Sequence, residues 1–123
     1  MTRPAVPGEK PLYWIGSSLK DIVRFPSDVQ RSVGFALSAA QYGGKHPAAR
    51  PWKGEGPEIP EVVKDYDGDT YRAIYTVRFA QAVYVLHVFQ KKPPRGIETR
   101  QSDAALVRER LKAAQRDYVE KYG

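Results

Sequence analysis

The chain has 123 residues, which suits one domain with a single core and leaves too little room for two. Apolar residues make up 41% of it, and eight Tyr, four Phe and two Trp argue against disorder. Because there is no cysteine, disulfides, thiol nucleophiles and thiolate metal sites are excluded. A net charge of +6 favours phosphates or an acidic protein as the partner.

The N-terminal stretch offers little to bury. Residues 1–10 contain Pro4, Pro7 and Gly8, so we expect a flexible arm ahead of a single domain over residues 11–123. No apolar run approaches the roughly 20 residues that a helix needs to cross a bilayer, and the N-terminus has no signal-peptide core. We therefore expect a cytoplasmic protein with no membrane partner.

A short strand over residues 12–16 is expected to lead into a helical hairpin. Ser17 or Ser18 is placed to cap the first helix, with Asp21 in position to reach back to the cap. Pro26 disfavours helical geometry at the residue before it, which predicts a bend between this helix and a second one. The second helix carries one apolar stripe, with members spaced by four and three residues: Val29, Val33, Leu37 and Ala40.

Three strands are predicted in the middle of the chain. Gly43 and Gly44 end the second helix, and the Pro- and Gly-rich segment 45–60 predicts a long connection. Asp67 and Gly68 form a strong hairpin-turn signal. The three strands are expected over residues 61–66, 70–79 and 82–90.

The last two of these strands have different patterns. The earlier one alternates between two faces of the sheet. One face holds Tyr71, Ala73, Tyr75, Val77 and Phe79, and the other holds Arg72, Ile74, Thr76 and Arg78. The later strand is apolar on both faces, as is typical of a central strand. Within it, His87 is in step with Val83, Val85 and Phe89.

The pattern over residues 102–122 predicts a C-terminal helix that is capped by Ser102 or Asp103. Asp117 and Lys121 lie one turn apart, in the favourable order for an ion pair. The element order is then strand, helix, helix, three strands and helix. This order predicts an α+β domain in which an antiparallel sheet has its helices packed on one face. The buried stripe of the C-terminal helix is expected to contain Val107, Leu111, Ala114 and Tyr118.

Cations gather at one end of the predicted sheet. Arg72 is expected to lie near residues 90–92, while Lys53 and Glu61 come from the segment before the hairpin. Such a cluster can bind a phosphate, because a guanidinium holds two phosphate oxygens in one plane and lysines add point charge. The same cations can instead be solvated strand ends that protect a sheet edge. The candidate cations are Lys53, Arg72, Lys91, Lys92, Arg95 and Arg100.

Four further residues are candidates for function. His87 is either a catalytic residue or a core histidine with a satisfied hydrogen bond, and Glu61 is either a general base or an exposed glutamate. Trp52 can stack on a base or pack in the core, and Arg78 is a further candidate for RNA binding. The histidine spacing gives no metal site, and the sequence predicts no cofactor.

Three stretches, residues 17–54, 61–92 and 98–118, carry a resemblance to a known family. Their most specific parts are "YRAIYTV" and "LHVFQKK", with a lysine pair closing the last strand. On these residues the chain resembles the HigB-like, phage-derived branch of the RelE/ParE toxin superfamily. The resemblance implies a RelE-like fold and a role as the toxin of a type II toxin–antitoxin pair.

The resemblance implies one of two activities. The RNA-cutting relatives enter the ribosomal A site, where the 2′-hydroxyl of the messenger RNA attacks the neighbouring phosphate without any metal. The ParE branch instead poisons DNA gyrase and cuts nothing. In either case the expected partner is an antitoxin, often a helix-turn-helix protein. A third reading is a decayed prophage protein that no longer cuts RNA.

The family pattern also suggests roles for residues. Arg72 matches the arginine of the family's "YR…Y" strand, which would stabilise the transition state. Lys91 and Lys92 match the basic end of the last strand. Lys53 and Glu61 fall near the positions that precede the hairpin, and either can be the base.

One segment departs from the family pattern. Many RNA-cutting relatives have a tyrosine or histidine just after the basic strand end, where this chain has Pro93, Pro94 and Arg95. Three outcomes follow: Lys92 donates the proton, His87 reaches the site, or the protein cuts poorly.

Overall fold

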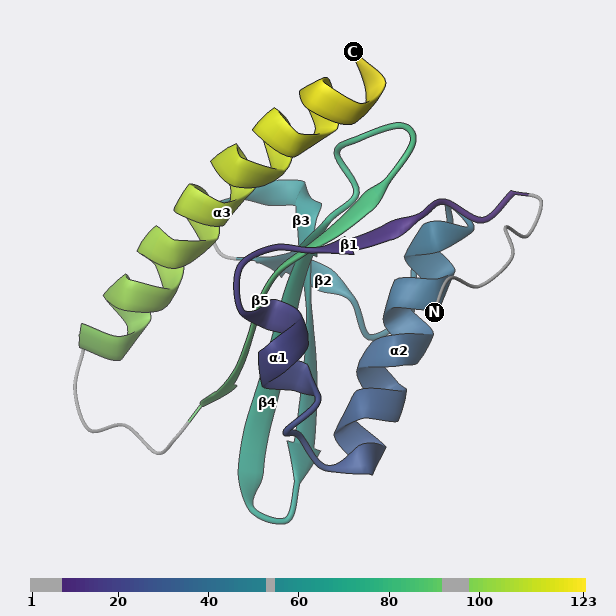
Figure 1. The fold of residues 1–123 in the computed structure, drawn as a ribbon. Helices are drawn as coiled ribbons and strands as arrows, with labels where there is room; N and C mark the ends of the chain where they lie inside the picture. The colour runs from purple at the N-terminus through teal and green to yellow at the C-terminus, as the bar shows by residue number, and fades with distance from the viewer. Residues whose placement is uncertain (1–7, 53–54, 92–97) are drawn as a thin grey trace.

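The computed structural model describes residues 8–52, 55–91 and 98–123, and the side chains in these ranges except those of residues 98–102. Over these ranges the chain forms one five-stranded sheet and three helices (Figure 1). In chain order the elements are β1 (Leu12–Trp14), α1 (Ser18–Ile22), α2 (Ser27–Gln41), β2 (Arg50–Trp52), β3 (Gly56–Tyr66), β4 (Asp69–Thr76), β5 (Val83–Lys91) and α3 (Glu98–Tyr122).

The sheet is mixed, so the prediction of an antiparallel sheet was wrong for one pair of strands. The strand order is β1-β5-β4-β3-β2, and β1 runs parallel to β5 while the other neighbours are antiparallel. A parallel partner needs a long crossover connection, and everything between β1 and β5 serves as that connection. The sequence also gave no sign of β2, which lies inside the predicted connection 45–60, or of the early start of β3 at Gly56.

Helices cover both faces of the sheet, which corrects the expectation that they share one. In Figure 1, α2 and α3 lie on opposite sides of the strands. The core between α2 and the sheet includes Val29, Val33, Ala73, Tyr75 and Val85. The core between α3 and the sheet includes Ile74, Tyr84, Leu86, Val107 and Ala114. A strand that is apolar on both faces, as β5 is, requires a cover on each side.

The predicted alternation of β4 is confirmed in part. Tyr71, Ala73 and Tyr75 face α2, whereas Ile74 faces α3. Phe79 was expected on the same face as Tyr71, Ala73 and Tyr75, but it packs in the α3-side core. The reason is that β4 ends at Thr76, so the period-two rule no longer applies three residues later.

An irregularity between β4 and β5 changes the orientation of His87. Ile74 is opposite His87, whereas the next residue, Tyr75, is opposite Val85, so Leu86 is an extra residue in β5. Such a bulge lets two consecutive side chains point toward one face. Leu86 packs in the α3-side core, and His87 bonds a side chain of α3. The prediction that His87 is in step with Val83 and Val85 was therefore wrong.

Several local signals are confirmed. Ser17 is the residue before α1, as predicted, but its side chain makes no capping hydrogen bond to the helix backbone; its hydroxyl donates to the Asp21 carboxylate at 2.7 Å instead. Pro26 precedes α2. Asp67 and Gly68 both have positive φ, 51° and 83°, as a two-residue hairpin turn with a matching twist requires.

The N-terminal side of the domain is attached to α2. Lys10 donates its backbone N–H to the Gln41 carbonyl at 2.8 Å, and the Gln41 side chain donates to the Lys10 carbonyl at 2.8 Å. Residues 1–7 of the expected arm lie outside the described residues. In the described part of the chain, no helix has the length and apolar character that a membrane span requires.

The C-terminal half of α3 is fixed by polar contacts. The Tyr84 hydroxyl donates to Asp117 at 2.6 Å, and Lys121 donates to the other oxygen of the same carboxylate at 2.6 Å, as the spacing predicted. The hydrogen bonds from Lys121 and Tyr84 lower the pKa of Asp117. Tyr13 and Tyr122 share a further hydrogen bond of 2.9 Å, which raises the pKa of Tyr122 to about 12.

Two glycines should respond oppositely to replacement by alanine. Gly16 has φ of +59°, and a Cβ there would lie 2.8 Å from Cζ of Arg110, so Gly16→Ala is expected to destabilise the fold by about 1–2 kcal/mol. Gly34 lies in α2 with open space around it, so Gly34→Ala is expected to stabilise by about 0.5–1 kcal/mol. Urea unfolding of the two variants and the wild type measures both changes, and equal effects would contradict the assignment.

Candidate active site

A buried ion pair between β3 and β4 forms the centre of the candidate site. Glu61 is opposite Ile74, and Arg72 is opposite Val63, so both side chains project to the face that α3 covers. Arg72 Nη1 donates to Glu61 Oε2 at 2.9 Å. Only 6% of the Glu61 side chain and 17% of the Arg72 side chain are exposed. A carboxylate this buried requires a cation beside it.

Arg50 adds a second cation from β2. It is directly opposite Glu61, and its Nε lies 3.8 Å from Glu61 Oε1. The Arg50 side chain is 67% exposed, so it faces solvent at the rim of the ion pair. Sequence reasoning missed this residue because a "RPW" tripeptide inside a Pro-rich stretch gives no strand signal.

The end of β5 lies beside the ion pair. Phe89 is opposite Arg72 and Lys91 is opposite Thr70, so Phe89, Arg72 and Lys91 share the α3-side face. Gln90 is opposite Tyr71 and therefore projects to the other face. The expectation that Arg72 lies beside the end of β5 is confirmed for Lys91. Lys53, Lys92 and Arg95 lie outside the described residues, and Arg100 lies in α3 with its side chain outside them.

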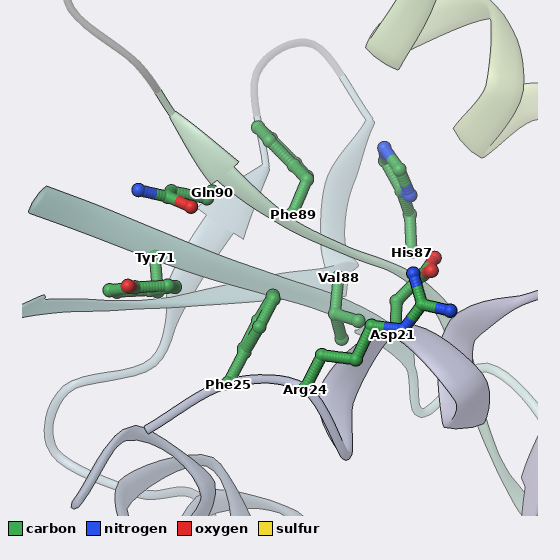
Figure 2. Close-up of a pocket in the computed structure, with 8 residues that line it drawn as sticks. All are labelled: Asp21, Arg24, Phe25, Tyr71, His87, Val88, Phe89 and Gln90. Carbon is green, nitrogen blue, oxygen red and sulfur yellow. The ribbon is translucent and has the colours of Figure 1, made fainter.

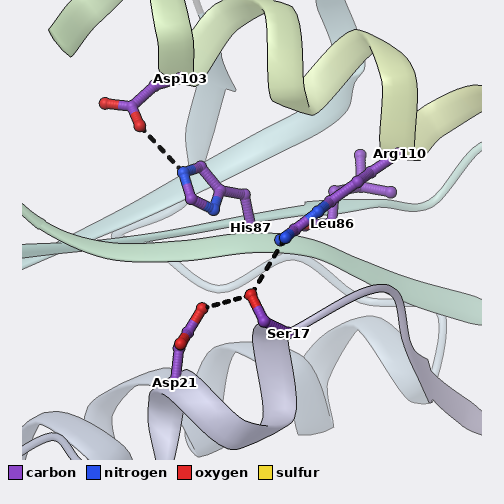
Figure 3. A network of polar contacts seen from close by, with 6 residues as sticks. All are labelled: Ser17, Asp21, Leu86, His87, Asp103 and Arg110. Carbon is purple, nitrogen blue, oxygen red and sulfur yellow. Dashed lines mark hydrogen bonds and ion pairs between the residues drawn. The ribbon is translucent and has the colours of Figure 1, made fainter.

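His87 pairs with a carboxylate from α3. Its Nε2 lies 2.9 Å from Oδ1 of Asp103 (Figure 3). Its ring stacks on Phe89, with the ring centroids 4.6 Å apart. Asp103 was expected to cap α3, but the helix begins at Glu98 and Asp103 lies within it. Sequence reasoning therefore missed its role, since only the packing of α3 on β5 brings the two residues together.

Burial determines the charge of His87. The side chain is 9% exposed, and this burial lowers its pKa from 6.5 although the hydrogen bond to Asp103 opposes the shift. The ring is then neutral near pH 7, and the Asp103 carboxylate can only accept, so Nε2 carries the proton. Among the residues described, nothing bonds Nδ1, which is buried. The ring therefore keeps an unused lone pair.

A second chain of contacts joins α3 to α1 beside this histidine. Arg110 donates to the Leu86 carbonyl and to the Ser17 hydroxyl, each at 3.0 Å, and Ser17 donates to Asp21 (Figure 3). The Leu86 carbonyl belongs to the bulge in β5. Arg110 thus satisfies a backbone acceptor that the irregular pairing leaves available.

Two predicted RNA-binding residues lie elsewhere. Trp52 is 8% exposed and packs in the α3-side core, so it is not available for stacking on a base. Arg78 follows β4 and pairs with Glu58 at 3.4 Å. It is six residues from Arg72, about 20 Å along an extended chain, so the structure does not bring it into the cluster.

The described residues contain no group of three or more His, Asp or Glu side chains that could hold a metal ion. The arrangement is instead one of cations around a buried carboxylate, next to a neutral imidazole. Such groups can bind a phosphodiester and exchange a proton with it.

The buried ion pair gives a stability prediction. Arg72→Met leaves the Glu61 carboxylate buried without its closest cation and is expected to cost about 3 kcal/mol. Adding Glu61→Leu should recover most of that loss, because two apolar side chains then replace two charges. Urea unfolding of the single and double variants gives the coupling free energy between Arg72 and Glu61. A double variant that is no more stable than Arg72→Met would contradict the prediction.

The lowered pKa of His87 gives a pH prediction. Between this pKa and 6.5 the unfolded chain binds the proton and the folded protein does not, so the free energy of unfolding should decrease as pH falls through this window. His87→Gln should flatten this part of the profile. His46 is present in both proteins and cancels in the comparison. Parallel profiles would show that His87 does not cause the dependence.

The comparisons with known proteins give one family. The family model described as "Phage derived protein Gp49-like (DUF891)" matches residues 20–112, which include Glu61, Arg72, His87 and Asp103. No curated protein matches the chain, and no solved structure does.

Proposed function

We propose that this chain, which belongs to the Gp49-like family of phage-derived proteins, is a toxin that cuts messenger RNA on the ribosome. The family is, in general, one of RelE-like toxins associated with toxin–antitoxin systems. The HigB-like branch and the RelE-like fold are part of this proposal. The observation that carries it is the Arg72–Glu61 pair beside Lys91 on one face of the sheet.

The reaction we propose needs no group from outside the RNA and the protein. The 2′-hydroxyl attacks the adjacent phosphorus, the bond to the 5′-oxygen breaks, and the products are a cyclic phosphate and a 5′-hydroxyl. A base removes the proton of the 2′-hydroxyl, and an acid returns one to the leaving oxygen. DNA lacks the attacking hydroxyl and is not cut.

Arg72 is the residue that we assign to the phosphate. Charge builds up on the phosphate oxygens in the transition state, and donors already in place stabilise it without reorganisation. Glu61 holds Arg72 by the 2.9 Å bond and is in this respect a positioning residue. Arg50 and Lys91 add positive charge on either side of the pair.

Two groups are candidates for the base. His87 is neutral near pH 7 and has a lone pair on Nδ1, but this atom is buried, so His87 serves as the base only if RNA binding opens a path to it. Glu61 is a carboxylate whose Oε1 faces Arg50. If His87 is the base, the rate of RNA cleavage should rise as the pH rises through the lowered pKa of the ring. Lys92 is the proposed acid because it follows Lys91 at the end of β5.

The proposal includes the partner and the place of action. A toxin of this kind acts on ribosomes in the cytoplasm and is neutralised by an antitoxin, which we expect to be a helix-turn-helix protein. The reading frame next to the gene tests this expectation, since toxin and antitoxin share an operon.

Purified ribosomes with a defined message test the proposed activity. The wild type is expected to cut the message and to leave cyclic-phosphate ends. Arg72→Lys should lower the cleavage rate about 100-fold, because lysine keeps the charge but loses the bidentate contact with the phosphate. Arg31→Lys is the matched control: Arg31 lies on α2 with 64% of its side chain exposed, and its variant should cut normally.

Two results would contradict this function. One is a wild-type protein that stops growth while messages stay intact, which points to a non-enzymatic inhibitor of gyrase or another host protein. The other is an Arg72→Lys variant that cuts at the wild-type rate, which removes Arg72 from the chemistry.

A further inference from the structure

A hollow of about 380 Å³ lies along β5 next to the candidate site (Figure 2). In the described residues, β1 pairs only with Val83–Val85, so the rest of this edge of β5 has no strand beside it. Residues from α1, from the bend after it and from β4 form the other walls. The lining consists of Asp21, Arg24, Phe25, Tyr71, His87, Val88, Phe89 and Gln90.

The walls combine aromatic and polar side chains. Phe25 and Tyr71 lie 4.9 Å apart between ring centroids, at 58°, and Figure 2 shows Phe89 on the opposite side of Val88 from Phe25. Phe25 and Phe89 are both half-buried residues. Flat apolar surfaces of this kind are platforms on which nucleobases stack.

Two polar side chains of the hollow have no partner among the described residues. Within the part of the chain that the structure describes, neither the Arg24 guanidinium nor the Gln90 amide makes a hydrogen bond or ion pair. Asp21 differs, because its carboxylate accepts the Ser17 hydroxyl. A free guanidinium binds phosphate, and a free amide can pair with the edge of a base.

The hollow meets the face that carries the ion pair at the free edge of β5. Phe89 lines the hollow and is also the direct cross-strand neighbour of Arg72. Tyr71 and Gln90 project to the face opposite Arg72, so a ligand in the hollow and a ligand on Arg72 lie on opposite faces of the sheet, on either side of β5. A polymer that occupies both places has to pass around the free edge of β5 at Phe89.

We propose that this hollow binds one unpaired nucleotide of single-stranded RNA whose chain passes around the free edge of β5 to the phosphate held by Arg72. The base stacks on Phe25, Gln90 reads the edge of the base, and Arg24 binds its phosphate. The inference rests on the proposed function because it assigns the ligand as RNA. It adds that the protein selects its RNA by a base in this hollow.

Binding of short RNA that resists cleavage tests the site without ribosomes. The probes are fluorescent 2′-O-methyl hexamers of A, C, G or U, in which the attacking hydroxyl is blocked, measured by anisotropy over a salt series. Arg24→Gln should reduce the slope of log affinity against log salt by about one. Arg31→Gln is the matched control, and its slope should equal that of the wild type.

Two further variants test the base. Phe25→Leu keeps an apolar side chain but removes the ring, and it should weaken binding about tenfold. Gln90→Leu should reduce the difference in affinity among the four hexamers while the tightest binding changes less. Thermal unfolding of each variant shows that the fold is kept, and free nucleoside monophosphates are the competitors that distinguish a strand from a single nucleotide.

Each outcome has a defined meaning. Equal losses for Arg24→Gln and Arg31→Gln, or no change of preference with Gln90→Leu, would overturn the site. Competition by a monophosphate as strong as that by a hexamer would assign the hollow to a free nucleotide and overturn the link to Arg72. Because the hexamers cannot be cut, binding in the hollow together with intact messages on ribosomes would refute the proposed function and leave this site standing.

Discussion

The carboxylate of Glu61 is the constraint on which the candidate site depends. A buried charge is costly, and it is retained only where a cation lies beside it with good geometry. Arg72 meets this need from the neighbouring strand at 2.9 Å, and Arg50 meets it from the other side at 3.8 Å. The pair holds the guanidinium in one position on the sheet, which is the state that transition-state stabilisation requires.

The bulge in β5 is the second element that shapes the site. Without the extra residue at Leu86, strict alternation would have put His87 on the side of α2, among the apolar side chains of that core. The irregular register instead brings the imidazole to Asp103, and Arg110 occupies the backbone carbonyl next to it. The same segment then continues to Phe89, which separates the imidazole from Arg72.

Helix α3 connects these features to the rest of the fold. Its first described side chain, Asp103, bonds β5, its middle residue Arg110 bonds both β5 and the start of α1, and Asp117 bonds Tyr84. The helix is therefore attached to one strand at three levels. Any change in how α3 packs would alter the environment of His87, while the ion pair between β3 and β4 joins two neighbouring strands and includes no residue of α3.

The sequence by itself determined the features that depend on neighbours along the chain. The helical hairpin with its bend at Pro26, the turn at Asp67 and Gly68, the alternation of β4 up to Tyr75 and the pairing of Asp117 with Lys121 all follow from short-range rules. The placement of Arg72 beside the end of β5 also followed, because a tight hairpin fixes which residues are opposite each other. The distance of Glu61 from Arg72 depended on the register of β3, which the sequence left open.

Only the tertiary structure decided the remaining features, because they join segments that are far apart in the chain. The parallel pairing of β1 with β5, the placement of α3 on the other face of the sheet, and the contacts of His87 with Asp103 and of Arg50 with Glu61 depend on packing. No periodicity encodes a bulge or a partner strand, since both are set by which apolar surfaces must be covered together.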